Sequence, residues 1–108
     1  FVTITMKHIA KKVAADGVKV ISNAGGMNPL ACKAAIEQVL AAQGVQLKVG
    51  VVLGDDLVER ADELRERGVS DMFTGGAFPA DVRSVNAYLG ARPIAALLNE
   101  GCDIVLTG

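Results

Sequence analysis

Three short apolar segments, at residues 18–24, 47–53 and 102–107, alternate with longer segments whose composition is typical of helices. Short and nearly continuous apolar runs are typical of strands that are covered on both faces, as in parallel sheets. Strands that alternate with amphipathic helices indicate parallel βαβ units with right-handed crossovers. The alternation therefore predicts an α/β fold with an open parallel sheet of βαβ units, Rossmann-like and in three layers.

The helices are expected at residues 4–16, 29–43, 57–67 and 84–100. Asn28 is a favoured N-cap and Pro29 suits the first helical position, so the second helix has a clear start. Pro93 falls inside the last segment and is expected to break or kink it, because proline disfavours helical geometry at the residue before it. A short strand at residues 72–74 is a further prediction.

Polar residues follow each predicted strand, at residues 22–26, 54–56 and 107–108. Open α/β sheets bind ligands at the carboxyl ends of their strands, which lie along one edge. The first of these exits leads into a helix N-terminus, where N–H groups and the helix dipole favour an anion. Gly25 and Gly26 are expected to adopt positive φ and to let a ligand approach the backbone.

The candidate ligand-binding residues come from the first and last of these exits and from the helix start. They are Ser22, Asn23, Gly25, Gly26, Asn28, Thr107 and Gly108. Asn23 and Thr107 are expected to hydrogen-bond the ligand, whereas Asn28 has an ordinary role as a cap. The glycine pair forms neither a Walker sequence nor a G-x-G-x-x-G fingerprint, which weakens the case for a dinucleotide-binding enzyme.

Asp55 and Asp56 are the candidate catalytic residues. One of them is expected to cap the helix at 57–67, which leaves the other as a spare carboxylate at a strand end. That carboxylate could hold Mg²⁺ through water, bind ribose hydroxyls, or act as a base if its pKa is raised. The pattern does not choose among these roles, so the metal ligands and the reaction stay open.

The chain has two cysteines, Cys32 and Cys102, and one histidine, His8. Their number and spacing exclude a Cys/His zinc site and disfavour a Cys–His nucleophile. Both cysteines are expected to be small buried hydrophobes, and His8 to be solvated. Tyr88 is expected to pack at an interface with its hydroxyl satisfied, although Asn86 nearby leaves a binding role open. Two distant cysteines fit a reducing compartment, and we expect a cytoplasmic protein.

Charge and composition also restrict the partners. The net charge is −1, aromatic residues make up 4 %, and there is no basic block, so neither nucleic acid nor a membrane surface is an expected partner. Apolar residues make up 51 % of only 108 residues. We therefore expect residues 1–108 to be a single, incomplete α/β domain of a longer protein. Its apolar surface and open sheet edges would be covered by the remainder or by another copy in a homo-oligomer.

Four segments resemble the amino-terminal region of the acyclic terpene utilisation A family in order and spacing. They are residues 22–29 (SNAGGMNP), 54–57 (GDDL), 86–94 (NAYLGARPI) and 103–108 (DIVLTG). The resemblance covers roughly residues 18–108. It implies a cytoplasmic role in bacterial breakdown of terpenoids such as citronellol and geraniol through acyl-CoA thioesters, and it implies no mechanism. Relatives are several times longer, and more often carry an acidic residue after the Thr-Gly at residues 74–75.

These observations predict a terpenoid-catabolism protein that binds an acyl-CoA or another anionic small molecule at the loops that follow the strands. An enzyme of undetermined reaction is the first interpretation. A non-catalytic assembly module of a terpenoid degradation complex is the second, because no nucleophile is evident. A nucleotide- or dinucleotide-binding enzyme is the third.

Overall fold

The computed structural model describes residues 1–108 as two compact units. Unit 1 comprises residues 1–53 and 89–108, and unit 2 comprises residues 54–88. The elements of unit 1 are the π-helical turn η1 (Val2–Met6), helices α1 (Lys7–Asp16), α2 (Pro29–Ala42) and α4 (Arg92–Asn99), and strands β1 (Val20–Ser22), β2 (Val49–Val51) and β3 (Ile104–Leu106). Unit 2 contains the 3₁₀ turn η2 (Val58–Arg60) and helix α3 (Ala61–Glu66). A single domain over the whole chain stays a prediction.

The three strands of unit 1 form one parallel sheet in the order β1-β3-β2. Ile104 lies opposite both Val20 and Val49, and Leu106 lies opposite both Ser22 and Val51. The strand that comes last in the sequence is thus the middle one, and all three of its residues are buried. This confirms the predicted α/β class and the open parallel sheet, with strands shorter than the apolar segments that predicted them.

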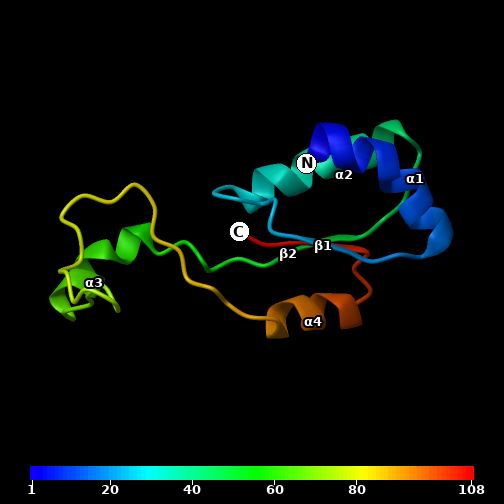
Figure 1. Ribbon diagram of the computed structural model, residues 1–108. Helices are drawn as coiled ribbons and strands as arrows, with labels where there is room; N and C mark the ends of the chain where they lie inside the picture. Colours follow the sequence, from blue (N-terminus) through cyan, green and yellow to red (C-terminus); the bar gives the residue numbers. More distant parts are fainter. The chain divides into compact units, whose positions relative to one another are not determined.

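Helices lie on both faces of this sheet, with α1 and α2 on one side and α4 on the other (Figure 1). Right-handed crossovers explain the arrangement. The chain moves from β1 past the position of β3 to β2, and then returns from β2 to β3. Because the two crossovers run in opposite directions across the sheet, right-handedness places their helices on opposite faces.

The core follows the alternation of side chains along β3. Ile104 and Leu106 pack on the first face with Met6, Ile36 and other residues of η1, α1 and α2. Val105 packs on the second face with Val52 and Cys102, against residues of α4. The two clusters contain no buried polar or charged residue. The side chains of the middle strand therefore contribute to the core on both faces of the sheet.

The start of α4 corrects the predicted helix at 84–100. The helix begins at Arg92, so Pro93 lies in its first turn, where the missing N–H leaves no hydrogen bond unmade. Residues 85–87 instead pair with residues 55–57: the Leu57 N–H donates to Val85 O at 2.7 Å, and the Ala87 N–H donates to Asp55 O at 2.8 Å. Backbone pairing with a distant segment thus replaces helix at residues 84–91.

Residues 72–74 form a turn and not the predicted strand. The Asp71 carboxylate accepts hydrogen bonds from the Phe73 N–H at 3.1 Å and from the Thr74 N–H at 2.7 Å. These bonds hold the chain in a turn, because a side-chain acceptor takes the N–H groups that a strand would offer to a neighbour. The bridge between Ser70 and Ala77 closes the turn into a short hairpin.

Asp103 ties together the amino ends of all three strands. It precedes β3, and its Oδ1 accepts a hydrogen bond from Lys19 Nζ, which precedes β1, at 2.7 Å. Its Oδ2 accepts from the N–H of Lys48, which precedes β2, at 2.8 Å. The Lys19 hydrogen bond, followed by the Lys48 N–H, lowers the pKa of Asp103 below its ordinary value. The ionised carboxylate is therefore the form that the fold stabilises.

An Asp103→Asn variant should lose a pH-dependent part of its stability. Because the native pKa is lowered, the ionised Asp103 stabilises the fold above the pKa of the unfolded chain, about 4. This stabilisation disappears as the pH falls through the lower native pKa. Urea unfolding between pH 7 and pH 2 should show a variant that is less stable at pH 7 and whose stability falls less below pH 4. Parallel pH profiles for the two proteins would contradict the role of Asp103.

Candidate functional site

The carboxyl edge of the sheet brings together residues from the ends of β1 and β3. The Thr107 N–H donates to Ser22 O at 3.0 Å, and the Gly25 N–H donates to Thr107 O at 3.1 Å. The loop after β1 is closed further by the Ala24 N–H, which donates to Ser22 Oγ at 3.2 Å. Ser22, Gly25 and Thr107 are therefore neighbours, as the parallel arrangement of the strands predicted.

The two glycines of this loop have different roles. Gly26 has a φ of +52°, as expected, whereas Gly25 does not have a positive φ. A Cβ added to Gly25 would lie 2.5 Å from Thr107 O and 2.9 Å from Pro29 Cβ. The prediction of positive φ is thus right for Gly26 and wrong for Gly25, where a glycine is needed because two backbone segments and a proline ring meet.

Asn28 caps α2, because its Oδ1 accepts a hydrogen bond from the Ala31 N–H at 3.0 Å. Its carbonyl accepts from the Cys32 N–H at 3.1 Å. Pro29 occupies the first position of the helix. This confirms the start of α2, and it shows that Asn28 uses its carboxamide oxygen within the chain.

The free hydrogen-bond donors of the loop are not the glycines. The Gly25 N–H donates to Thr107 O, and the Gly26 N–H donates to Asn23 O at 3.3 Å. The N–H groups of Met27 and Leu30 make no hydrogen bond within the chain. The sequence suggested the N–H groups of Gly25, Gly26 and the start of the helix at 29–43 as anion donors. Leu30 lies in that helix start and its N–H is free, because the first turn of a helix lacks internal acceptors, whereas the Met27 N–H was not singled out.

Asn23 and Thr107 also belong to this edge. Asn23 is exposed, and its side chain makes no hydrogen bond within the chain. The Thr107 hydroxyl donates to Gly108 O at 3.1 Å. Asn23 therefore has the uncommitted polar side chain of the loop, and its role in binding stays a prediction, like those of the other residues chosen.

Asp55 and Asp56 lie in unit 2, where each makes a local contact. Asp56 Oδ1 accepts a hydrogen bond from the N–H of Val58, the first residue of η2, at 3.0 Å. Asp55 Oδ2 accepts from Asn86 Nδ2 at 3.2 Å. The N-cap residues of η2 and α3 are Leu57 and Arg60, and neither makes a side-chain cap hydrogen bond, so the prediction that Asp55 or Asp56 is the helix cap is wrong. Asp56 instead closes a local turn one residue before the N-cap of η2. No group of three or more His, Cys, Asp or Glu side chains gathers to hold a metal ion.

The structure places the remaining residues that the sequence singled out. Cys102 is buried and Cys32 is partly buried against the first core cluster, which confirms both as small core residues. His8 is exposed and its Nδ1 lies next to Ile4 O. Tyr88 is fully exposed, so the prediction that it packs at an interface is wrong within this chain, because no neighbouring element covers it.

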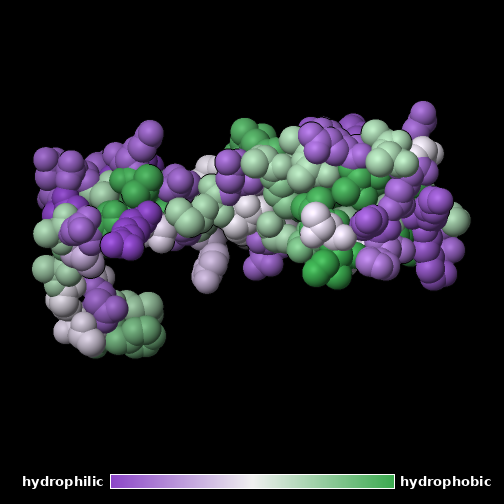
Figure 2. Space-filling view, turned by 90° about the horizontal axis from the view of Figure 1, so that it is seen from above, coloured by the Kyte–Doolittle hydropathy of each residue, from purple (hydrophilic) through white to green (hydrophobic).

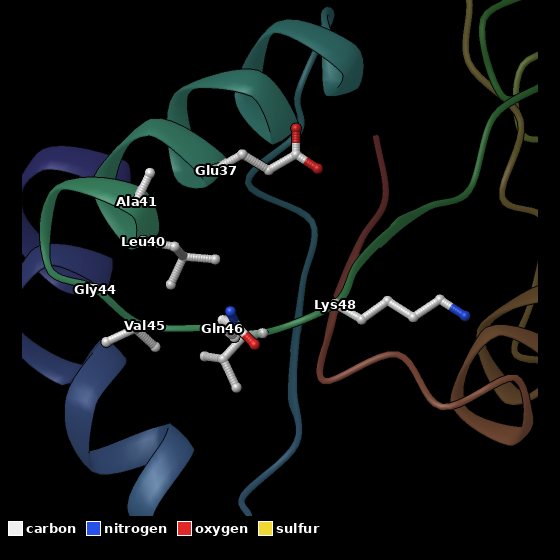
Figure 3. A pocket seen from close by; sticks show the side chains of 8 residues that line it. Glu37, Leu40, Ala41, Gly44, Val45, Gln46 and Lys48 are labelled. Atoms are coloured by element: carbon white, nitrogen blue, oxygen red, sulfur yellow. The ribbon is translucent and has the colours of Figure 1, made fainter.

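A depression away from the carboxyl edge lies beside α2 and the segment at residues 44–48, which leads into the amino end of β2 (Figure 3). Its volume is about 670 Å³, and it is open to solvent. Its charged side chains are committed elsewhere: Lys48 Nζ donates to Glu100 O at 2.8 Å, and Glu37 lies 3.7 Å from Lys33 Nζ. This depression offers a ligand no charged group that is free of an intramolecular contact.

Comparison with known families decides what kind of chain this is. The family model described as acyclic terpene utilisation family protein AtuA matches residues 1–108. The chain belongs to the AtuA family. No curated protein and no solved structure matches it significantly. The AtuA match confirms the family resemblance, and it extends that resemblance to η1 and α1, which carry none of the four motifs.

No helix of this AtuA-family chain has both the length and the apolar character needed to cross a lipid bilayer. The longest, α2, has 14 residues, whereas about 20 are needed.

Proposed function

We propose that this AtuA-family chain serves acyclic terpene utilisation by binding an anionic small molecule, an acyl-CoA of terpenoid origin, at the carboxyl edge of its sheet. The arrangement of the crossovers carries the proposal. The connection that leaves β1 goes to the face of α1 and α2, and the connection that leaves β2 reaches α4 on the opposite face. Ligands of open α/β sheets bind where neighbouring connections diverge in this way, here next to the end of β3. We further propose that this sheet is part of a Rossmann-like, three-layer fold.

The chemistry of the loop after β1 suits a ligand that is both anionic and apolar. The free N–H groups of Met27 and Leu30 and the positive end of the α2 dipole favour a phosphate or carboxylate. The side chains of these two residues are 77 % and 57 % exposed. Apolar groups next to anion donors match a thioester that has phosphates at one end and a terpenoid chain at the other. This match is the reason to prefer an acyl-CoA to an inorganic anion.

Asp55 is the better of the two carboxylates for a chemical role. Asp56 holds the start of η2, whereas Asp55 has one oxygen without a hydrogen-bond partner in the chain. That oxygen could accept a proton or a water ligand of Mg²⁺. If the protein is an enzyme, Asp55→Asn should lower its activity more than Asp56→Asn, whose main effect should be on stability.

The proposal includes a cytoplasmic location and partners other than nucleic acid or a membrane surface. Six lysines and five arginines are outweighed by twelve acidic residues, so the chain lacks the net positive charge and the basic block that favour either of those partners.

An Asn23→Ala variant should bind acyl-CoA about tenfold more weakly, because one hydrogen bond to a charged group contributes roughly 1.5 kcal/mol. Isothermal titration calorimetry of the full-length protein with a panel of acyl-CoAs, free coenzyme A and nucleotides would measure the loss. Asn23 is exposed, so the unfolding midpoint should not change.

Asn99→Ala is the matched control, because Asn99 is an exposed asparagine at the carboxyl end of α4. This variant should keep the affinity of the wild-type protein. Binding of no member of the panel, or equal losses for the two asparagine variants, would contradict the proposed site.

A further inference from the structure

The hairpin at residues 70–77 presents two large apolar side chains to solvent in an ordered turn. Met72 is 85 % exposed and Phe73 is 87 % exposed. An isolated exposed apolar residue needs no explanation, but two neighbouring ones at the tip of a hairpin are typical of an interaction surface. We call this tip, Met72 and Phe73, the apolar tip.

The turn that carries the apolar tip is held by a dense set of hydrogen bonds. Asp71 accepts from the Phe73 N–H, the Thr74 N–H and Thr74 Oγ1 at 3.1, 2.7 and 2.8 Å. The Asp71 N–H donates to Gly76 O, and the Gly75 N–H donates to Asp71 O, both at 2.8 Å. Because the turn is already ordered before binding, the tip loses less conformational entropy when a partner binds it.

Unit 1 has an apolar groove between η1 and α2. The residues that line it include Val2, Ala35, Val39 and Ala42, together with Lys7. Its volume is about 500 Å³. Figure 2 looks onto the α1 and α2 side of unit 1 and shows green apolar side chains between the purple hydrophilic ones. The groove is therefore large and apolar enough for one or two side chains of the size of Met and Phe.

The charges of the two units are opposite. Unit 2 has eight acidic and four basic side chains, whereas unit 1 has four acidic and seven basic ones. The unit that carries the apolar tip is thus acidic overall, with Asp71 next to the tip, and the unit that carries the groove is basic overall, with Lys7 among the residues that line the groove. Opposite charge steers such surfaces together and disfavours contacts between like ones.

We propose that the chain associates with a second copy of itself by placing the apolar tip of one copy in the η1/α2 groove of the other. The tip, the groove and the two complementary charges are all present on one sequence, so no other partner is required. The same acidic charge of unit 2 opposes insertion of the tip into an anionic bilayer. The contact joins two different surfaces, so it is of the heterologous kind.

Sedimentation equilibrium of the full-length protein over a wide concentration range tests the contact. Phe73→Ala should weaken self-association by about 30-fold, the loss typical of a buried aromatic residue at an interface. Asp71→Ala keeps the tip but loosens the turn, and should weaken association roughly two- to tenfold. Tyr88→Ala, which removes another exposed aromatic ring of unit 2, should leave association unchanged. Circular dichroism would confirm that each variant is folded.

Disulfide cross-linking between substituted cysteines tests which residues are in contact. Met72→Cys and Val39→Cys proteins, both of which keep Phe73, should form a disulfide-linked heterodimer when they are mixed and mildly oxidised, whereas Met72→Cys mixed with Ala14→Cys on α1 should not. A protein that stays monomeric at all concentrations would overturn the proposal. So would a Phe73→Ala variant that associates like the wild-type protein, or equal cross-linking at residues 39 and 14. Sedimentation of the protein with phosphatidylglycerol vesicles, lost in Phe73→Ala, would overturn it in favour of a membrane.

Discussion

A Leu106→Ala variant is expected to lower the free energy of unfolding by about 2–5 kcal/mol. Leu106 is fully buried, and it lies in the middle strand, in the cluster that joins β3 to α1 and α2. Truncation removes apolar contacts and leaves a cavity that a strand held on both sides cannot collapse to fill. Urea unfolding followed by circular dichroism would measure the change.

Leu30→Ala is the control for that variant. Leu30 is 57 % exposed on α2, so the same truncation there should change the free energy of unfolding by no more than about 0.5 kcal/mol. If Leu106→Ala cost as little as Leu30→Ala, the position of β3 between β1 and β2 would be wrong, since an edge strand has fewer neighbours to lose.

A Gly25→Ala variant is expected to cost about 1–3 kcal/mol, the usual range for inserting a methyl group into a packed site. The new Cβ would lie 2.5 Å from Thr107 O and 2.9 Å from Pro29 Cβ, and a real Cβ does not approach backbone so closely. Either the Gly25–Thr107 hydrogen bond breaks or the start of α2 moves. Urea unfolding would measure the cost, and amide hydrogen exchange at Gly25 would show whether the hydrogen bond is lost.

Gly26→Asn is the matched control, one residue further along. A Cβ at Gly26 would meet nothing within 4 Å, and asparagine tolerates the left-handed conformation that its φ of +52° requires. We expect a change of less than about 1 kcal/mol. Equal costs at the two glycines would show that conformation, and not close packing, explains Gly25.

Much of the fold could be predicted from local patterns. The start of α2 was predictable because Asn28 and Pro29 satisfy the special needs of a helix N-terminus within a few residues. The parallel sheet was predictable from short apolar runs that alternate with helices. The predicted helix at 84–91 was wrong because residues 85–87 pair with residues 55–57, some thirty positions away. Local secondary-structure propensity cannot predict a pairing between segments so far apart.

The proximity of the ends of β1 and β3 was predictable, whereas the free N–H donors beside them were predictable only in part. The exits of β1 and β3 meet, as parallel strands require, through the Gly25–Thr107 and Thr107–Ser22 hydrogen bonds. Those same bonds occupy the Gly25 N–H, which the sequence suggested as an anion donor. Of the N–H groups that remain free, Leu30 lies in the helix start that the sequence indicated, whereas Met27 is identified as a free donor only from the hydrogen bonds of its neighbours.

The sequence by itself determined the class of fold, the boundaries of α2, and membership of the AtuA family. These depend on residue type and on spacing along the chain, and each is readable over a few residues or as an ordered set of motifs. Only the tertiary structure decided that the last strand lies in the middle of the sheet, and that Gly25 is required by packing. Strand order and close backbone approach depend on contacts between residues far apart in sequence. No single segment of the sequence therefore predicts them.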